Sequence, residues 1–157
     1  MKRFLFLCTE SDRNEAGQLQ DYLQGKLRNF ADLRNIADII ADEQDFGSTL
    51  RRSECVVLVG SRQASSFIQN KQQETEEDYI TFDGKVIHDE FAQSKELVDR
   101  FIIVFLEEKT NSDWIPTGFN EKMIFNLKGG KIFRGNPSLT HLEYTTRRVL
   151  GQTALDW

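Results

Sequence analysis

Three uninterrupted apolar runs, separated by polar segments, constrain the fold of this chain more than any other feature. They are Phe4–Cys8, Cys55–Val59 and Phe101–Leu106, and a weaker run lies at Met123–Leu127. Each run has the length of a strand rather than of a helix. Strands that are apolar at every position are buried on both faces, which is typical of a parallel sheet covered by helices on each side. The runs therefore predict the strands of such a sheet.

Helical spacing fills the intervals between these runs. One predicted helical face carries Ala16, Leu19, Leu23 and Leu27, and a later one carries Ile87, Phe91 and Val98. A fifth strand is expected near Asn29–Arg34. The alternation of strands and helices predicts an α/β fold with a doubly wound sheet, whose ligands bind beyond the carboxyl ends of the strands. The length of 157 residues suits a single domain, residues 1–157.

Composition excludes several classes of function. The net charge of −5, with no basic run longer than a pair, argues against nucleic-acid binding. The apolar stretch Phe4–Cys8 is too short for a secretory signal or a membrane span, so we expect a cytoplasmic protein without membrane insertion. Cys8 and Cys55 lie inside apolar runs, which favours reduced, buried thiols. Two His without ligand spacing predict no metal site.

One long polar segment is expected to be irregular. The stretch Ser61–Gly84 is predicted to be an extended loop with room for one short helix. The small residues of Gly60–Ser66 would let backbone amides approach a phosphate or ribose, although they fit an ordinary strand exit equally well. Lys128–Lys131, the sequence KGGK, lacks the spacing of a P-loop and predicts a turn.

The octapeptide GKVIHDEF, residues 84 to 91, sets carboxylates at the start of the later helix. At helical spacing Glu90 shares a boundary line with Val86 and Leu97, whereas Asp89 points to water and His88 lies at the surface. Such a carboxylate near the positive end of a helix is either a solvated stabilising charge or a functional group. Residue chemistry alone favours the solvated charge.

The order of these segments resembles that of Toll/interleukin-receptor (TIR) domains. FLFLCTESDR, with Ser11 and Asp12, resembles the opening box of that family, and CVVLVGS, ending in Ser61, resembles its third strand. VIHDEFAQSKE and RFIIVFLEE resemble the helix and fourth strand that follow. WIPTGF, residues 114 to 119, is similar to a segment of the SEFIR branch found in interleukin-17 receptors and their adaptor. The resemblance also implies that Asn35–Asp45 is the loop after the second strand, here without the Pro-Gly of the family.

The resemblance implies a flavodoxin-like three-layer fold with five parallel strands in the order 2-1-3-4-5. In that arrangement we expect Cys8, Val57, Val59, Ile103 and Phe105 to be buried.

The resemblance also implies a site. In TIR domains that cleave NAD⁺ a Glu on this helix is catalytic, and Glu90 matches it. Further NAD⁺-binding residues would be Thr9, Glu10, Gly60, Ser61, Arg62 and Val86. Val86 stands where the family has a Trp.

Two functions follow from the resemblance. The first is an immune-effector domain that hydrolyses NAD⁺ at the nicotinamide glycosidic bond, with NAD⁺ as substrate and no cofactor or metal. The alternative is a non-catalytic SEFIR-like adaptor that signals through homotypic contacts. Both imply self-association or pairing with other TIR or SEFIR domains.

Overall fold

The computed structural model describes residues 1–69, 84–107, 110, 113–127 and 136–151. Its centre is a sheet of five parallel strands in the order β2-β1-β3-β4-β5, as predicted. The strands are β1 (Lys2–Leu7), β2 (Ala31–Arg34), β3 (Cys55–Gly60), β4 (Phe101–Phe105) and β5 (Ile124–Asn126). All four apolar runs and the fifth expected strand near Asn29–Arg34 therefore contain strands, with ends that differ by a few residues.

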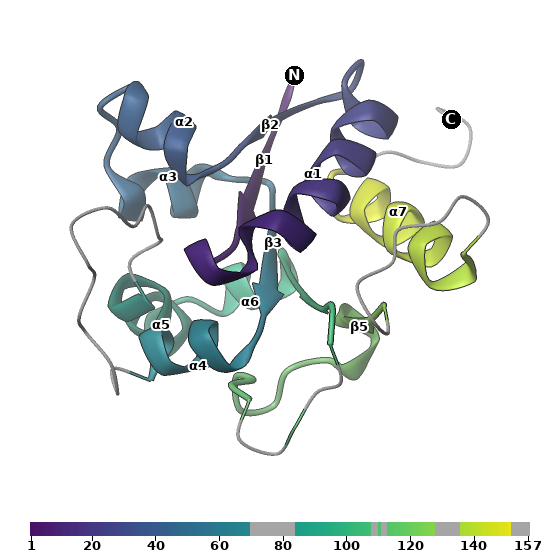
Figure 1. The fold of residues 1–157 in the computed structure, drawn as a ribbon. Helices are drawn as coiled ribbons and strands as arrows, with labels where there is room; N and C mark the ends of the chain where they lie inside the picture. Colours follow the sequence, from purple (N-terminus) through teal and green to yellow (C-terminus); the bar gives the residue numbers. More distant parts are fainter. Residues whose placement is uncertain (70–83, 108–109, 111–112, 128–135, 152–157) are drawn as a thin grey trace.

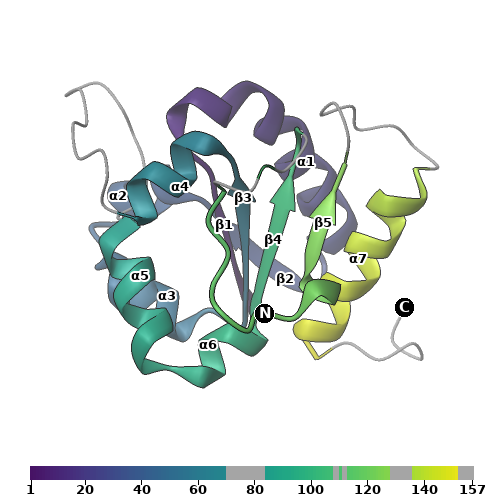
Figure 2. The same cartoon turned by 90° about the horizontal axis from the view of Figure 1, so that it is seen from below.

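Helices cover both faces of this sheet (Figures 1 and 2). On one face lie α1 (Arg13–Leu27) and α7 (Pro137–Val149). The other face is covered by α2 (Ile36–Ala41), α3 (Phe46–Arg52), α4 (Arg62–Ile68), α5 (Gly84–Gln93) and α6 (Lys95–Asp99). Two short 3-10 helices, η1 (Glu10–Asp12) and η2 (Glu121–Met123), lead into α1 and β5.

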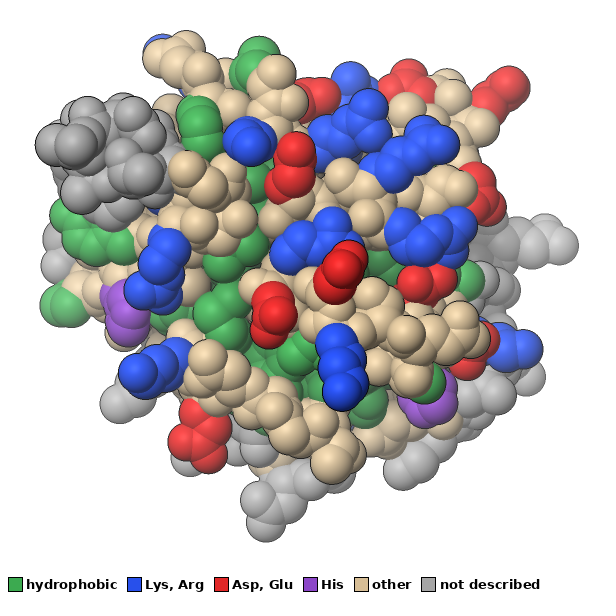
Figure 3. Space-filling model, turned by 180° about the vertical axis from the view of Figure 1, so that it is seen from behind, with side chains coloured by type: hydrophobic (Ala, Val, Ile, Leu, Met, Phe, Trp, Pro, Cys, Tyr) green, Lys and Arg blue, Asp and Glu red, His purple; other side chains and the backbone are tan. Residues whose placement is uncertain are grey.

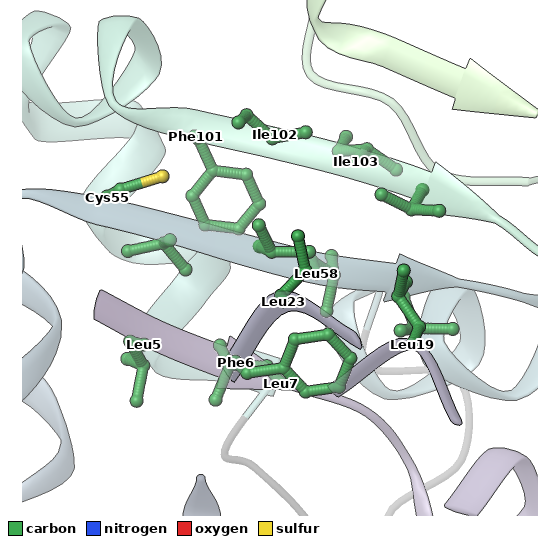
Figure 4. Close-up of a cluster of buried hydrophobic side chains, with 14 of the residues drawn as sticks. Leu5, Phe6, Leu7, Leu19, Leu23, Cys55, Leu58, Phe101, Ile102 and Ile103 are labelled. Atoms are coloured by element: carbon green, nitrogen blue, oxygen red, sulfur yellow. The ribbon is translucent and has the colours of Figure 1, made fainter. Parts of the chain in front are cut away.

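The core lies between the sheet and its helices, with the central strands β1, β3 and β4 in the middle (Figure 4). Val57, Val59, Ile103 and Phe105 are all 2% exposed or less, as predicted. Leu58 and Val104, which lie between them and point to the opposite faces, are equally buried, so β3 and β4 are covered on both faces. Cys8 was expected to be buried as well, and that expectation was wrong. It lies beyond the end of β1, where the chain leaves the sheet toward η1, and it is partly exposed.

The predicted helix over residues 87 to 98 is divided in two. Ser94 is extended, and its side chain accepts a 3.4 Å hydrogen bond from the N–H of Leu97, so it ends α5 and caps α6. Leu97 is consequently a fully buried residue of α6 and shares no boundary line with Glu90. The continuous helical spacing concealed this break because the apolar positions of α6 face the same core.

The two segments expected to be irregular contain helices. The loop predicted at Asn35–Asp45 contains α2, whose first turn is a capping box between Asn35 and Asp38. The segment after β3 begins with the short helix α4. The remainder of that predicted loop, residues 70–83, and the turn predicted at Lys128–Lys131 lie outside the described residues. Among the described residues, no helix is both long and apolar enough to cross a membrane.

Candidate functional site

Asp12 organises the polar residues at the carboxyl ends of β1 and β3. Thr9 donates its hydroxyl to Asp12 Oδ2 at 2.8 Å, and Ser61 donates to the same oxygen at 2.6 Å. The Ser61 hydroxyl also accepts a 3.0 Å hydrogen bond from the N–H of Ala64 in the first turn of α4. Thr9 is 1% exposed. The cluster therefore ties the exits of two strands together, and its hydroxyls are already occupied.

A cavity of about 450 Å³ opens beside this cluster at the carboxyl ends of β1 and β2. Thr9 and Glu10, both predicted to bind NAD⁺, line it. Its wall also carries carboxamide side chains, from Asn14, Gln18, Gln20 and Asn35. Glu10 forms an exposed ion pair with Arg13 at 3.3 Å. Amides that both donate and accept hydrogen bonds suit a polar, uncharged part of a ligand.

Gly60, Ser61 and Arg62, the other predicted group, line a separate cavity of about 320 Å³ at the carboxyl ends of β3 and β4. The charged side chains of its wall are Asp12, Glu15, Arg62, Glu107 and Asp113. Acidic groups thus predominate, and they disfavour the diphosphate of a dinucleotide by charge repulsion.

Packing accounts for the glycine at the end of β3. A Cβ atom at Gly60 would lie 2.5 Å from Phe105 Cε1, closer than any side chain tolerates. Phe105 is the last residue of β4 and pairs with Gly60 in the sheet register. Glycine at position 60 therefore leaves room for the Phe105 ring, and its presence alone does not indicate a phosphate-binding turn.

Glu90 lies apart from both cavities. Its Oε1 accepts a 2.7 Å hydrogen bond from Nη1 of Arg51, in the last turn of α3, and the two groups form an ion pair. The Glu90 side chain is 15% exposed and that of Arg51 is 54% exposed. Glu90 lines neither of these two cavities. The charge of the candidate catalytic carboxylate is thus compensated by the guanidinium of Arg51 on the neighbouring helix α3.

Close packing of α3 against α5 brings this pair together. A Cβ atom at Gly47 would lie 3.6 Å from Val86 Cγ1, an ordinary contact, and 3.3 Å from Arg51 Nη1, so the two helices approach closely at this residue. Val86 is partly buried in this contact. Asp89 and His88, on the outer side of α5, are 52% and 58% exposed, which confirms their predicted surface positions.

The predicted site residues therefore fall into two groups. Thr9, Glu10 and Gly60 to Arg62 lie at the carboxyl ends of the strands, whereas Glu90 and Val86 pack against α3. Arg51, the direct partner of Glu90, was missed. No sequence signal could have identified it, because it lies 39 residues before Glu90 and on another helix.

Neither thiol is an activated nucleophile. Burial raises the pKa of the Cys55 thiol. Burial, together with the negative charges of Asp12 and Glu10, raises the pKa of Cys8 to about 11. Both groups are therefore protonated at neutral pH, and a thiol reacts through its thiolate form. No cluster of His, Cys, Asp or Glu suited to a metal ion occurs in the described part of the chain.

Comparison with known proteins identifies the fold. The structure is similar to a solved prokaryotic SEFIR domain, with a TM-score of 0.60 and 12% sequence identity, over 99% of this chain and 96% of that one. No family model matches the sequence, and no curated protein gives a significant match. The chain therefore has the α/β fold of TIR and SEFIR domains, as the resemblance of its segments predicted.

Proposed function

We propose that this domain acts in signalling as a non-catalytic adaptor, by binding further copies of itself or other domains of the same fold. The observation that carries this proposal is the ion pair between Glu90 and Arg51. A carboxylate that stabilises a positively charged transition state must face the substrate, whereas here the carboxylate of Glu90 is paired with the guanidinium of Arg51. Likeness to a SEFIR domain over nearly the whole chain supports the same function.

An apolar side chain on α2 is the surface feature that favours self-association. Ile40 is 57% exposed, on a helix at the end of the molecule away from α7 (Figure 1). A partner that covered this side chain would remove its apolar surface from water, which favours association. Ile36, one turn earlier on α2, is only partly buried and lines the cavity beside β1 and β2. We therefore expect α2 to lie within the homotypic interface.

Light scattering over a rising protein concentration tests the adaptor function. The parent chain should assemble, and Ile40→Glu should weaken assembly by at least about tenfold, because it buries a charge in an apolar contact. Tyr144→Glu is the matched control, since Tyr144 is 47% exposed and lies on α7. The adaptor function would be refuted if the parent chain stayed monomeric at high concentration and also bound no added domain of the same fold.

A second candidate function is hydrolysis of NAD⁺, favoured by the cavity of about 450 Å³ that Thr9 and Glu10 line. In this reaction the bond between ribose C1′ and the nicotinamide nitrogen breaks, and its electron pair leaves with neutral nicotinamide. The resulting oxocarbenium ion is stabilised by a carboxylate and takes up water, which releases a proton and forms ADP-ribose. Glu90 would act in this way only if Arg51 moved away and the substrate extended beyond this cavity to α5, because Glu90 does not line the cavity.

Release of nicotinamide from NAD⁺ by the concentrated, assembled protein distinguishes the two functions. Glu90→Gln and Asp89→Asn each remove one charge from the same turn of α5. An enzyme would lose about 10²-fold or more of its turnover with Glu90→Gln and almost none with Asp89→Asn. That pattern would overturn the adaptor function. The adaptor function predicts no nicotinamide release above the protein-free rate from the parent or from either variant.

A further inference from the structure

A third cavity, of about 470 Å³, lies away from the sites considered so far. Its walls come from the start of β1, the edge strand β2, and α3 with the loop that precedes it. Arg3, Arg34 and Arg52 line it, together with Asp32 and Asp45. Figure 3 shows the back of the molecule, where Lys and Arg side chains gather in the upper half. Three arginines and two aspartates therefore line one cavity of a chain whose net charge is −5.

The acidic groups around this cavity keep their negative charge, and each accepts a hydrogen bond within the protein. Asp32 accepts a hydrogen bond from Arg34 Nε at 3.1 Å, and Arg34 also donates to Asp42 at 2.6 Å. The positive charge of Arg34 is therefore compensated by these two carboxylates. Asp45 accepts a 2.9 Å hydrogen bond from the N–H of Ser48 at the start of α3. Glu54 accepts a hydrogen bond from the backbone N–H of Arg3.

The guanidinium groups of Arg3 and Arg52 are not engaged in this way. Within the described part of the chain, neither forms an ion pair or a side-chain hydrogen bond. The Ser48 hydroxyl, also in the wall, accepts a 3.4 Å hydrogen bond from Arg51 and keeps its own proton to donate. Two forked cations and one hydroxyl donor therefore line the same cavity.

We propose that this cavity binds a small phosphate ester, with Arg3 and Arg52 holding the phosphate oxygens. Guanidinium groups match the geometry of phosphate and bind it through paired charge-assisted hydrogen bonds. A volume of about 470 Å³ is that of a small-molecule site and leaves space beyond the phosphate for the esterified group. The Ser48 hydroxyl supplies a further donor to the same anion.

NMR titration of the amide signals tests the proposal, with inorganic phosphate and ribose 5-phosphate as probes at constant ionic strength. Both should give saturable shifts confined to the cavity wall, and ribose 5-phosphate should bind more tightly. Arg3→Gln and Arg52→Gln should each weaken binding by about tenfold, the effect of one charge-assisted hydrogen bond. Arg148→Gln, an exposed arginine in the last turn of α7, should leave it unchanged.

Lysine variants separate charge from geometry. Arg3→Lys and Arg52→Lys keep the charge and lose the fork, so binding should fall between that of the parent and the Gln variants. Their amide spectra without ligand establish that the fold is intact. Shifts that stay linear with phosphate and spread over many arginines would overturn the site. Equal affinity for phosphate and ribose 5-phosphate would overturn the ester.

Discussion

The ion pair between Arg51 and Glu90 should contribute measurably to stability, because it joins α3 to α5. Two opposite charges 4 Å apart attract by about 1 kcal/mol in water and about 4 kcal/mol in a medium with an effective dielectric constant of 20. Here the atoms are 2.7 Å apart, but Arg51 is 54% exposed and solvent screens its charge. Ordering two long side chains also costs entropy. We therefore expect a coupling free energy of about 1 kcal/mol.

A double-mutant cycle measures that coupling. Arg51→Gln and Glu90→Gln keep most of the shape of each side chain, and urea unfolding followed by circular dichroism gives the free energy of unfolding of each variant. The double variant should lose about 1 kcal/mol less than the sum of the single losses. The coupling should weaken in 1 M NaCl, since part of the pair faces solvent.

Asp89→Asn provides the control for the same helix. The Asp89 side chain is 52% exposed and its recorded contact is His88 at 3.6 Å, so the free energy of unfolding should change by no more than about 0.5 kcal/mol. A coupling below about 0.3 kcal/mol would refute the structural role of the pair. A loss with Asp89→Asn as large as that with Glu90→Gln would show that the charge of the helix, rather than its partner, is what matters.

Three further predictions concern the core and the contact between α1 and α7. Ile103→Ala should lower the free energy of unfolding by about 2–5 kcal/mol in urea, because Ile103 is fully buried and leaves a cavity. Gly60→Ala should cost about 1–3 kcal/mol, and the added variant Phe105→Leu should recover part of that loss, since the new methyl group meets the ring. Burial, together with the carboxylate of Glu143, raises the pKa of Tyr22 to about 12. The ultraviolet absorbance of Tyr22 should therefore change near pH 12, and the stability that its neutral hydroxyl contributes should decline between about pH 10 and pH 12. A titration midpoint near pH 10 would contradict this prediction.

The strands could be recognised from the sequence because their signal is local. Cys55–Val59 and Phe101–Leu106 contain no polar side chain, and only burial on both faces satisfies such a run. The helix α2 had a local signal as well, since Asn35 followed by Asp38 is a capping pattern. It was missed because the segment was compared with a loop of the family.

The candidate site was harder to predict because its residues meet across elements. Thr9 and Ser61 meet at the carboxyl ends of neighbouring strands, because parallel strands bring those ends to one edge, whereas their predicted binding of NAD⁺ stays a prediction. The position of Glu90 depended on the packing of α5 against α3. A helical wheel gives the direction of a side chain on its own helix and says nothing of what faces it.

The sequence by itself determined that this protein has a two-sided core, because long apolar runs leave no other way to keep their side chains from water. Tertiary structure alone decided what its charged residues do. Arg51 and Glu90 are 39 positions apart and lie on two different helices. The sequence leaves open which charged residues become neighbours. Only the packing of α3 against α5 brings the guanidinium of Arg51 to the carboxylate of Glu90.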